Sequence, residues 1–186
     1  MEAPASLSGH YLLAMPGIGD PRFERAVIAM CAHDGDGALG IGIGRTVPRI
    51  GLHSLLEQVD IDPGVAPDCA IHVGGPVEQQ RGFVLHTLDW DGGDTLRVGS
   101  RWGLTSTLDV LRAISEGRGP QQWIVALGYA GWAEGQLDDE MKRHGWLATA
   151  GDDALMFANP ANQRWELALR SAGIDPRLLS TESGRA

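Results

Sequence analysis

Glycine occurs at short intervals throughout this sequence, and this implies many tight turns and close backbone approaches. The chain has 26 glycines among 186 residues, which is about twice the usual frequency. Glycine adopts positive φ angles and lets two backbones approach closely, so it marks tight turns and close contacts. Because a chain of this length forms about one domain and 43% of its residues are hydrophobic, we expect one compact domain with a sizeable core.

The spacing of apolar residues predicts strands that alternate with helices. Apolar runs and alternations predict strands at residues 11–15, 26–33, 38–45, 71–73, 81–87, 96–98, 123–127 and 154–157. Helical spacing and capping residues predict one helical turn after Asp20 and helices at residues 52–59, 106–117, 134–144 and 160–173. The short connections within 26–45 and 81–98 favour hairpins, so the sheet should be mixed.

These elements define a fold class and a domain. We expect an α+β fold, or a layered α/β variant, in which helices flank a mixed, curved and barrel-like sheet. One compact domain should span residues 10–179, with an N-terminal tail at 1–9 and a polar C-terminal tail at 180–186.

The charge distribution argues against direct binding to nucleic acids. The formal net charge is −9, and residues 51–100 contain eight acidic residues against two arginines. A protein that binds duplex DNA needs clustered lysine and arginine, because neutralising phosphates supplies most of the affinity. Only folding could supply such a cluster here, by gathering Arg22, Arg25, Arg45 and Arg49 on one face.

Cysteine content and hydropathy predict a cytoplasmic protein without disulfides or membrane spans. Cys31 and Cys69 are too few for a disulfide framework, and they do not form a C-x-x-C motif. The first eight residues lack the basic and apolar regions of a signal peptide. No run approaches the roughly 18 apolar residues that a membrane-spanning helix needs.

Cys31 and His33 are the candidate reactive side chains. They lie two positions apart near the end of a predicted strand, so alternation places both on one face. A thiolate and an imidazole in contact could act as nucleophile and base, or begin a metal site. Alternatively, Cys31 is a buried apolar thiol and His33 makes local hydrogen bonds at the end of the hairpin. The other histidines have no paired spacing, so the sequence predicts no metal site.

Residues 126–136 are the most suggestive candidate for a binding site. A predicted strand runs into a loop with Gly128 and Gly131 and then into a helix N-terminus, where free backbone N–H groups favour an anion. Trp132 could cover such a ligand. Alternatively, Glu134 satisfies those donors itself and Trp132 completes the core.

The glycine run at residues 40–46 lacks the spacing of a phosphate-binding loop. A P-loop needs a glycine five positions before its second glycine and a lysine after it, but Leu39 and Arg45 occupy those positions. Glycine on one face of a strand more simply allows a neighbouring element to approach closely. We therefore expect no nucleotide site at this run.

A series of short motifs runs along almost the whole chain, from residue 10 to residue 179. In order, they are Leu13-Ala-Met-Pro16, Asp20-Pro21 with Phe23, Cys31, His33, Gly37-Ala-Leu-Gly40, Gly74-Gly75-Pro76, Arg81-Gly82-Phe83-Val84-Leu85-His86, Asp109-Val110-Leu111, Ala126-Leu-Gly-Tyr-Ala-Gly-Trp132, Gly135-Gln136-Leu137 and Trp146-Leu147. In content and order, these motifs resemble the YqgE/AlgH family of bacterial proteins.

The resemblance implies one α+β domain in a bacterial cytosolic protein with no known cofactor and no established catalytic activity. The family's association with the control of alginate synthesis also implies a transcriptional regulator, and the acidic charge would make that regulation indirect. The sequence has Gly44-Arg45-Thr46 where Asn-Lys-Pro or Asn-Arg-Pro usually follows the hairpin strand, and Ala32 where a glutamate is common. Both departures alter the polar groups of the first hairpin.

These observations favour a non-enzymatic regulatory module that binds a small anion or a protein partner. Its site is expected among the loops at residues 15–20, 74–76 and 128–132, where backbone donors and one aromatic side chain could surround a ligand. The alternative is a hydrolase or transferase that uses Cys31 and His33. The sequence does not indicate an oligomeric state. The predicted ligand-binding residues are Gly74, Gly75, Arg81, Gly128, Gly131, Trp132 and His33.

Overall fold

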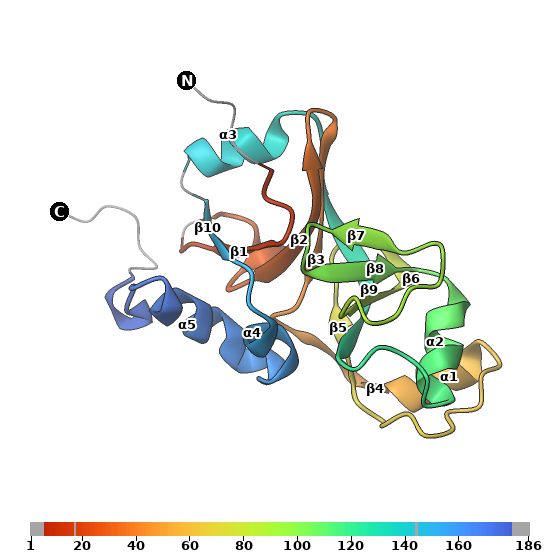
Figure 1. The fold of residues 1–186 in the computed structure, drawn as a ribbon. Coiled ribbons are helices and arrows are strands. Elements are labelled where there is room, and N and C mark those ends of the chain that lie inside the picture. Colours follow the sequence, from red (N-terminus) through yellow and green to blue (C-terminus); the bar gives the residue numbers. More distant parts are fainter. Residues whose placement is uncertain (1–5, 17, 144, 180–186) are drawn as a thin grey trace.

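The structure is a computed structural model that describes residues 6–16, 18–143 and 145–179. Within these ranges the chain forms ten strands and five α-helices, with a 3-10 turn near each end. Figure 1 shows α4 and α5 on one side of the sheet and α1 and α2 on the other. Residues 1–5, 180–186, Gly17 and His144 lie outside the described residues, and so do the corresponding parts of the predicted tails and the predicted end of the third helix.

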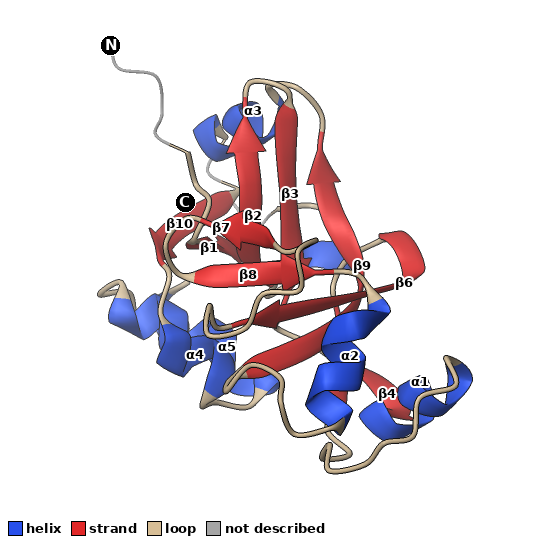
Figure 2. Cartoon of the chain, turned by 45° about the vertical axis from the view of Figure 1, so that its right-hand side comes forward, coloured by secondary structure: helices blue, strands red, loops and turns tan. Residues whose placement is uncertain are grey.

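Eight strands form one continuous sheet, and two more join its middle. The order is β10-β1-β2-β3-β9-β6-β8-β7, while β5 pairs in parallel with β9 and β4 pairs with β5. The sheet curls until β7 contacts β2, which gives the half-barrel seen in Figure 2. The strands are β1 His10–Ala14, β2 Val27–Asp34, β3 Gly37–Gly42, β4 Thr46–Gly51, β5 Ala70–Val73, β6 Val77–His86, β7 Leu96–Val98, β8 Trp102–Thr105, β9 Trp123–Trp132 and β10 Trp146–Ala150.

The helices cover the sheet in separate groups. They are α1 Leu52–Gln58, α2 Leu108–Ser115, α3 Gln136–Lys142, α4 Asp153–Phe157 and α5 Ala161–Ser171, with 3-10 turns η1 Pro21–Phe23 and η2 Pro176–Leu178. Asp20 caps η1 as the sequence predicts, because its side chain accepts a hydrogen bond from the Arg22 amide and Pro21 occupies the first position. No helix within the described ranges has the length and apolar character required to cross a membrane.

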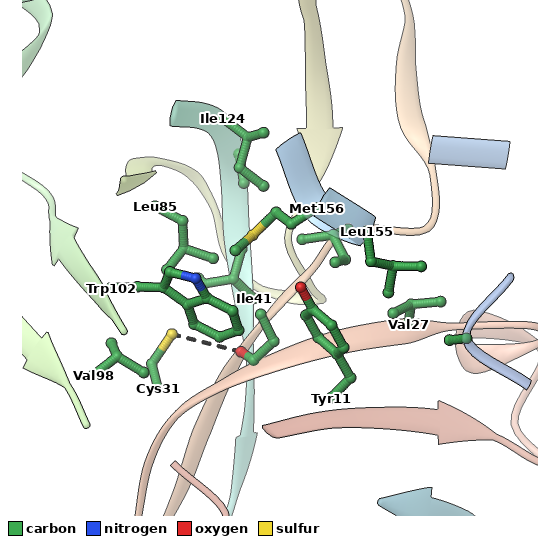
Figure 3. Close-up of a cluster of buried hydrophobic side chains, with 14 of the residues drawn as sticks. Tyr11, Val27, Cys31, Ile41, Leu85, Val98, Trp102, Ile124, Leu155 and Met156 are labelled. Atoms are coloured by element: carbon green, nitrogen blue, oxygen red, sulfur yellow. Dashed lines mark hydrogen bonds between the residues drawn. The ribbon is translucent and has the colours of Figure 1, made fainter. Parts of the chain in front are cut away.

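The largest core cluster fills the inside of the curled sheet. Tyr11 stacks on Trp102 with 5.5 Å between ring centroids, and both side chains are almost fully buried. The Trp102 indole N–H donates to Asp153 at 2.8 Å, which joins the sheet to the start of α4. Figure 3 shows Leu155 and Met156 of α4 closing this cluster beside the two rings.

Two further clusters lie outside the curl. One joins α1 and α2 to strands β5, β6 and β9 through Leu56, Leu111, Ile71, Val84 and Val125. The other packs α3 and η1 against β1, β2 and β10, and it contains Trp132 and Trp146. The predicted α+β class and mixed, curved sheet are therefore confirmed in a single domain.

Several predicted elements are corrected by the structure. Residues 154–157 are not a strand but belong to helix α4, because Asp152 accepts a hydrogen bond from the Ala154 amide and starts a helix there. Residues 81–87 and 96–98 are not hairpin partners, since β7 and β6 both pair with β8. The strands β4, β8 and β10 were not predicted. They are short strands. In β8, the ring of His86 occupies the position that a side chain at residue 103 would take, so glycine is present there.

Candidate ligand-binding site

Two of the three predicted binding loops meet backbone to backbone. The Gly74 amide donates to the Leu127 carbonyl at 2.8 Å. A Cβ atom at Gly74 would lie 2.1 Å from the carbonyl oxygen of Gly128, and one at Gly75 would lie 2.1 Å from the carbonyl carbon of Tyr129. Glycine is required at both positions because no side chain fits between these backbones.

One of these two segments, residues 128–132, is not a loop, contrary to the sequence prediction. Residues 128–132 continue strand β9, and Gly128 allows the local backbone change with a φ of 77°. Trp132 packs inside the cluster under α3, in an edge-to-face contact with Trp146 at 6.0 Å. Gly131 is exposed on the same strand. The long strand forms because β9 pairs with β5 and β6 along its first half and with β3 along its second.

Cys31 and His33 do not share a face, and a β-bulge is the reason. The pairing of β2 with β3 shifts between Met30 and Ala32, so the alternation reverses after Cys31. Cys31 lies in the inner core, where burial strongly raises the pKa of its thiol. His33 instead accepts a hydrogen bond from the Leu7 amide at 3.1 Å and lies 3.4 Å from Asp138 on α3. The pair therefore lacks the contact that a nucleophile and its base require.

Arg81 is held on the surface of β6. Its guanidinium lies 3.2 Å from Glu78, donates to Ser106 at 3.2 Å, and stacks over the Phe83 ring at 5.1 Å. These contacts neutralise its charge locally.

A small hollow opens beside Gly74 and Gly75, and we call it the glycine-corner hollow. Its volume is about 130 Å³. The floor is apolar, and the buried residues Val27 and Ile28 form part of it. The remaining lining residues are Arg22, Phe23, Ala26, Gly42, Gly44, Arg45, Val73, Gly74, Gly75, Pro76 and Gln79.

The hollow forms where β3 leaves its partner β2. The two strands pair as far as Ile28 and Gly42, and the chain then turns away to pair with β5. The Gly42 amide donates to the Gly74 carbonyl at 2.7 Å, and the Val73 amide donates to the Arg45 carbonyl at 2.9 Å. A Cβ atom at Gly42 would lie 2.5 Å from the Val73 carbonyl oxygen, so glycine allows the two segments to close on each other.

Two arginines from distant parts of the sequence meet at this hollow. The Arg45 guanidinium donates to the Arg22 carbonyl at 2.8 Å. Arg22 is itself paired with Asp20 at 2.7 Å, whereas no carboxylate within the described ranges pairs with Arg45. Arg25 pairs with Glu166 at 3.0 Å. The fold thus leaves one unneutralised guanidinium beside the hollow rather than a basic stripe.

Sequence reasoning missed a second polar centre, formed by His72 and Arg164. Both side chains are buried, and Arg164 is only 4% exposed. Its Nη1 lies 2.7 Å from Nε2 of His72, and its other hydrogen bonds go to the carbonyls of Ile43, Leu155, Met156 and Asn159.

Burial shifts the pKa values of both groups. Burial and then the charge of Arg164 lower the pKa of His72 to about 4, so the imidazole is neutral at pH 7. Burial also lowers the pKa of Arg164 to about 10, which leaves the guanidinium charged. A signal was present in the sequence: His72 is the polar residue in the apolar segment 70–73, and Arg164 lies four positions before Ala168 on the buried side of its helix.

The half-barrel sheet, its separate helical covers and the glycine-corner hollow define a single-domain α+β protein. The chain belongs to the AlgH-like family, whose family model matches residues 11–177. It is 70% identical over 186 residues to a UPF0301 protein of Rhizorhabdus wittichii, with both chains fully covered. It is 53% identical over 184 residues to a UPF0301 protein of Sphingopyxis alaskensis, covering 99% of this chain and 98% of that one.

Two solved structures are similar to this fold. The solution structure of the AlgH protein from Pseudomonas aeruginosa matches with a TM-score of 0.81 and 36% identity, covering 100% of this chain and 99% of that one. A crystal structure of a Corynebacterium diphtheriae protein matches with a TM-score of 0.74 and 21% identity, covering 96% and 92% of the two chains. The second likeness shows the fold alone.

Proposed function

We propose that this chain is a non-enzymatic binding module that takes a small organic anion at the glycine-corner hollow. The observation that carries the proposal is the unneutralised guanidinium of Arg45 beside an apolar hollow in a chain of net charge −9. Arg45 lines this hollow and has no carboxylate partner among the described residues, so an anion seated in the hollow could pair with it. Gly74 and Gly75, two of the residues predicted from the sequence, line the same hollow.

The size and lining of the hollow indicate the kind of ligand. Its volume of about 130 Å³ is close to the roughly 150 Å³ of an apolar protein cavity that holds benzene. The floor is apolar and the charged group lies at one side, so the ligand should combine a compact apolar group with one negative end. A benzoate-sized carboxylate fits this description.

Regulation by this protein would be indirect. A module that binds an anion can change its affinity for a protein partner, whereas the dispersed arginines, of which Arg22 and Arg25 are in ion pairs, do not provide a DNA-binding surface. The free thiols of Cys31 and Cys69 support placement in the cytoplasm, where thiols stay reduced. We accordingly propose a cytoplasmic regulator that acts through another protein.

Titration of the ¹⁵N-labelled protein with benzoate, followed by NMR, tests the proposal. Benzoate should shift the amide signals of Gly44, Gly74 and Gly75, and uncharged benzyl alcohol should bind more weakly. Arg45→Gln should weaken benzoate binding by about tenfold, the usual value of one charge-assisted hydrogen bond.

The matched control is Arg170→Gln, which removes an exposed arginine near the end of α5. This variant should bind benzoate like the unmodified chain. Equal affinity of the Arg45→Gln variant, or signal shifts confined to other surfaces, would reject the proposed site.

A further inference from the structure

We propose a second ligand site, specific for an organic monocarboxylate, at the N-terminus of α5. A separate hollow of about 480 Å³ opens there, between the start of α5 and strands β5 and β9. It is larger than the glycine-corner hollow and does not share any lining residue with it. His72 and Arg164 form its polar wall, and none of its described lining residues is acidic.

The charge of Arg164 points to an anion. The guanidinium is almost completely buried, yet all its partners are neutral: four backbone carbonyls and the His72 imidazole. Within the described part of the chain, no carboxylate forms an ion pair with it. Buried charges in proteins are normally paired with an opposite charge. The carbonyls at the end of α4 carry only partial negative charge, and a bound anion would supply a full one.

Arg164 has one more N–H donor than its described partners use. A guanidinium has five N–H groups. Nε donates to Leu155 and Asn159, Nη1 faces Ile43 and His72, and Nη2 donates to Met156 at 2.5 Å. One N–H of Nη2 therefore has no partner among the described residues.

His72 keeps the site positive. Its Nδ1 lies 3.1 Å from the Val125 carbonyl, so the ring proton is on Nδ1 and Nε2 accepts from Arg164. A neutral imidazole in this orientation holds the guanidinium in place and does not cancel its charge. The net charge at this wall of the hollow is therefore +1.

No side chain among the described residues caps the start of α5. The helix has 11 residues, its N-cap is Pro160, and neither a capping side chain nor an acidic residue occupies its first turn. The Ala161 and Asn162 amides lie at this end, and both residues line the hollow. Free N–H groups and the helix dipole favour a negative group there.

These groups define the class of ligand. Arg164, Ala161 and Asn162 all line the hollow, so a guanidinium and a helix N-terminus lie beside the same space, and the single positive charge matches a monoanion. Trp123 and Ile124 provide an apolar wall for the rest of the molecule. Asp68 directly precedes Cys69, which lines the hollow. Its carboxylate accepts a hydrogen bond from the His53 amide at 2.9 Å, and Asp68 itself does not line the hollow. A flat organic acid larger than benzoate fits this hollow. The same acid is too large for the glycine-corner hollow, so it distinguishes the two sites.

The test uses 1-naphthoate and its uncharged analogue 1-naphthalenemethanol. NMR titration with naphthoate should shift the Arg164 side-chain N–H signal and the Ala161 and Asn162 amides. The alcohol should bind at least about tenfold more weakly, because it lacks the charge that the guanidinium and helix end select. Naphthoate should also slow the reaction of Cys69, which lines the hollow, with a neutral maleimide.

Replacing Arg164 would leave four carbonyls without a donor and could prevent folding, so the variant of choice fills the hollow instead. Ala161→Trp places a large side chain in the hollow and keeps Arg164, and it should weaken naphthoate binding by about tenfold or more. Ala172→Trp, at the other end of the same helix, is the matched control and should not change the affinity.

The proposal is overturned if naphthoate does not bind, if it binds the Ala161→Trp variant as well as the unmodified chain, or if the alcohol binds equally. Benzoate binding at Arg45 is measured separately, so each site can fail without the other.

Discussion

The guanidinium of Arg164 and the imidazole of His72 lie 2.7 Å apart in the interior, and together they join the C-terminal helices to the sheet. Arg164 also donates to Leu155 and Met156 at the end of α4 and to Ile43 beyond the end of β3. The last carbonyls of a helix carry partial negative charge, so they stabilise a buried cation. This one side chain therefore connects α4, α5, β3 and β5.

Arg164→Met should strongly destabilise the fold. The change leaves several buried carbonyls without a donor, and we expect a loss of about 3–5 kcal/mol in the free energy of unfolding. Urea denaturation followed by circular dichroism measures the loss. The control Arg170→Met, on the exposed side of α5, should change stability by less than about 0.5 kcal/mol. Similar stability of the two variants would show that Arg164 does not join the helices to the sheet.

Stability should fall between pH 6.5 and pH 4 because of His72. Burial lowers the pKa of His72 to about 4, while the unfolded chain has an ordinary histidine pKa of about 6.5. In this window the unfolded state binds a proton that the folded state does not, so the free energy of unfolding decreases as the pH decreases. The pKa difference corresponds to a loss of up to about 3 kcal/mol.

Urea denaturation at several pH values, compared with the variant His72→Gln, isolates this effect. Glutamine keeps an acceptor for Arg164 but does not titrate, so the variant should have a smaller decrease in stability over the window. The pKa of His86 is also lowered by burial, and its contribution is present in both proteins. Arg177 lowers the pKa of Asp175 to about 2, so the protonation of Asp175 changes the stability only below this pH window. Identical slopes for the two proteins would contradict the assignment.

Gly74→Ala should destabilise the chain, whereas Gly82→Ala should not. The added Cβ at Gly74 would lie 2.1 Å from the Gly128 carbonyl oxygen, and one at Gly82 would have no atom within 4 Å. Because two strands must separate to accept the first methyl group, we expect a loss of about 3 kcal/mol for Gly74→Ala and less than about 0.5 kcal/mol for Gly82→Ala. Thermal or urea denaturation of the two variants measures both changes, and equal losses would argue against the close approach.

The two thiols should differ in reactivity in the folded chain. Cys31 is buried with its pKa strongly raised, while Cys69 is partly exposed with its pKa raised by burial and by the charge of Asp68. Iodoacetamide should therefore modify Cys69 slowly and leave Cys31 intact until the protein unfolds. Peptide mass spectrometry identifies the modified residue. Selective modification of Cys31 at neutral pH would restore the enzymatic alternative.

Local patterns predicted most of the elements because their signals lie within single segments. Leu52, Leu55, Leu56 and Val59 define helix α1, and Asp20 with Pro21 defines the turn η1. The short strands β4 and β10 lack such signals. Their pairing partners are far away in the sequence, and tertiary contacts decide their conformation.

The candidate sites depended on relationships that no local pattern contains. The bulge at Cys31 reversed the face of His33, and alternation alone could not predict it. The glycines at 74 and 75 were recognised, but their close contact with β9 depends on the fold. His72 and Arg164 are 92 residues apart, so their hydrogen bond could not be predicted from either segment.

The most direct test of the proposed function measures where benzoate binds in solution. Intermolecular nuclear Overhauser effects between the benzoate ring protons and the protein methyl groups report distances of a few ångströms. We predict signals to the methyl groups of Val27 and Val73, which line the glycine-corner hollow, and their loss in the Arg45→Gln variant. Contacts to other methyl groups only, unchanged by that variant, would contradict an anion site beside Arg45.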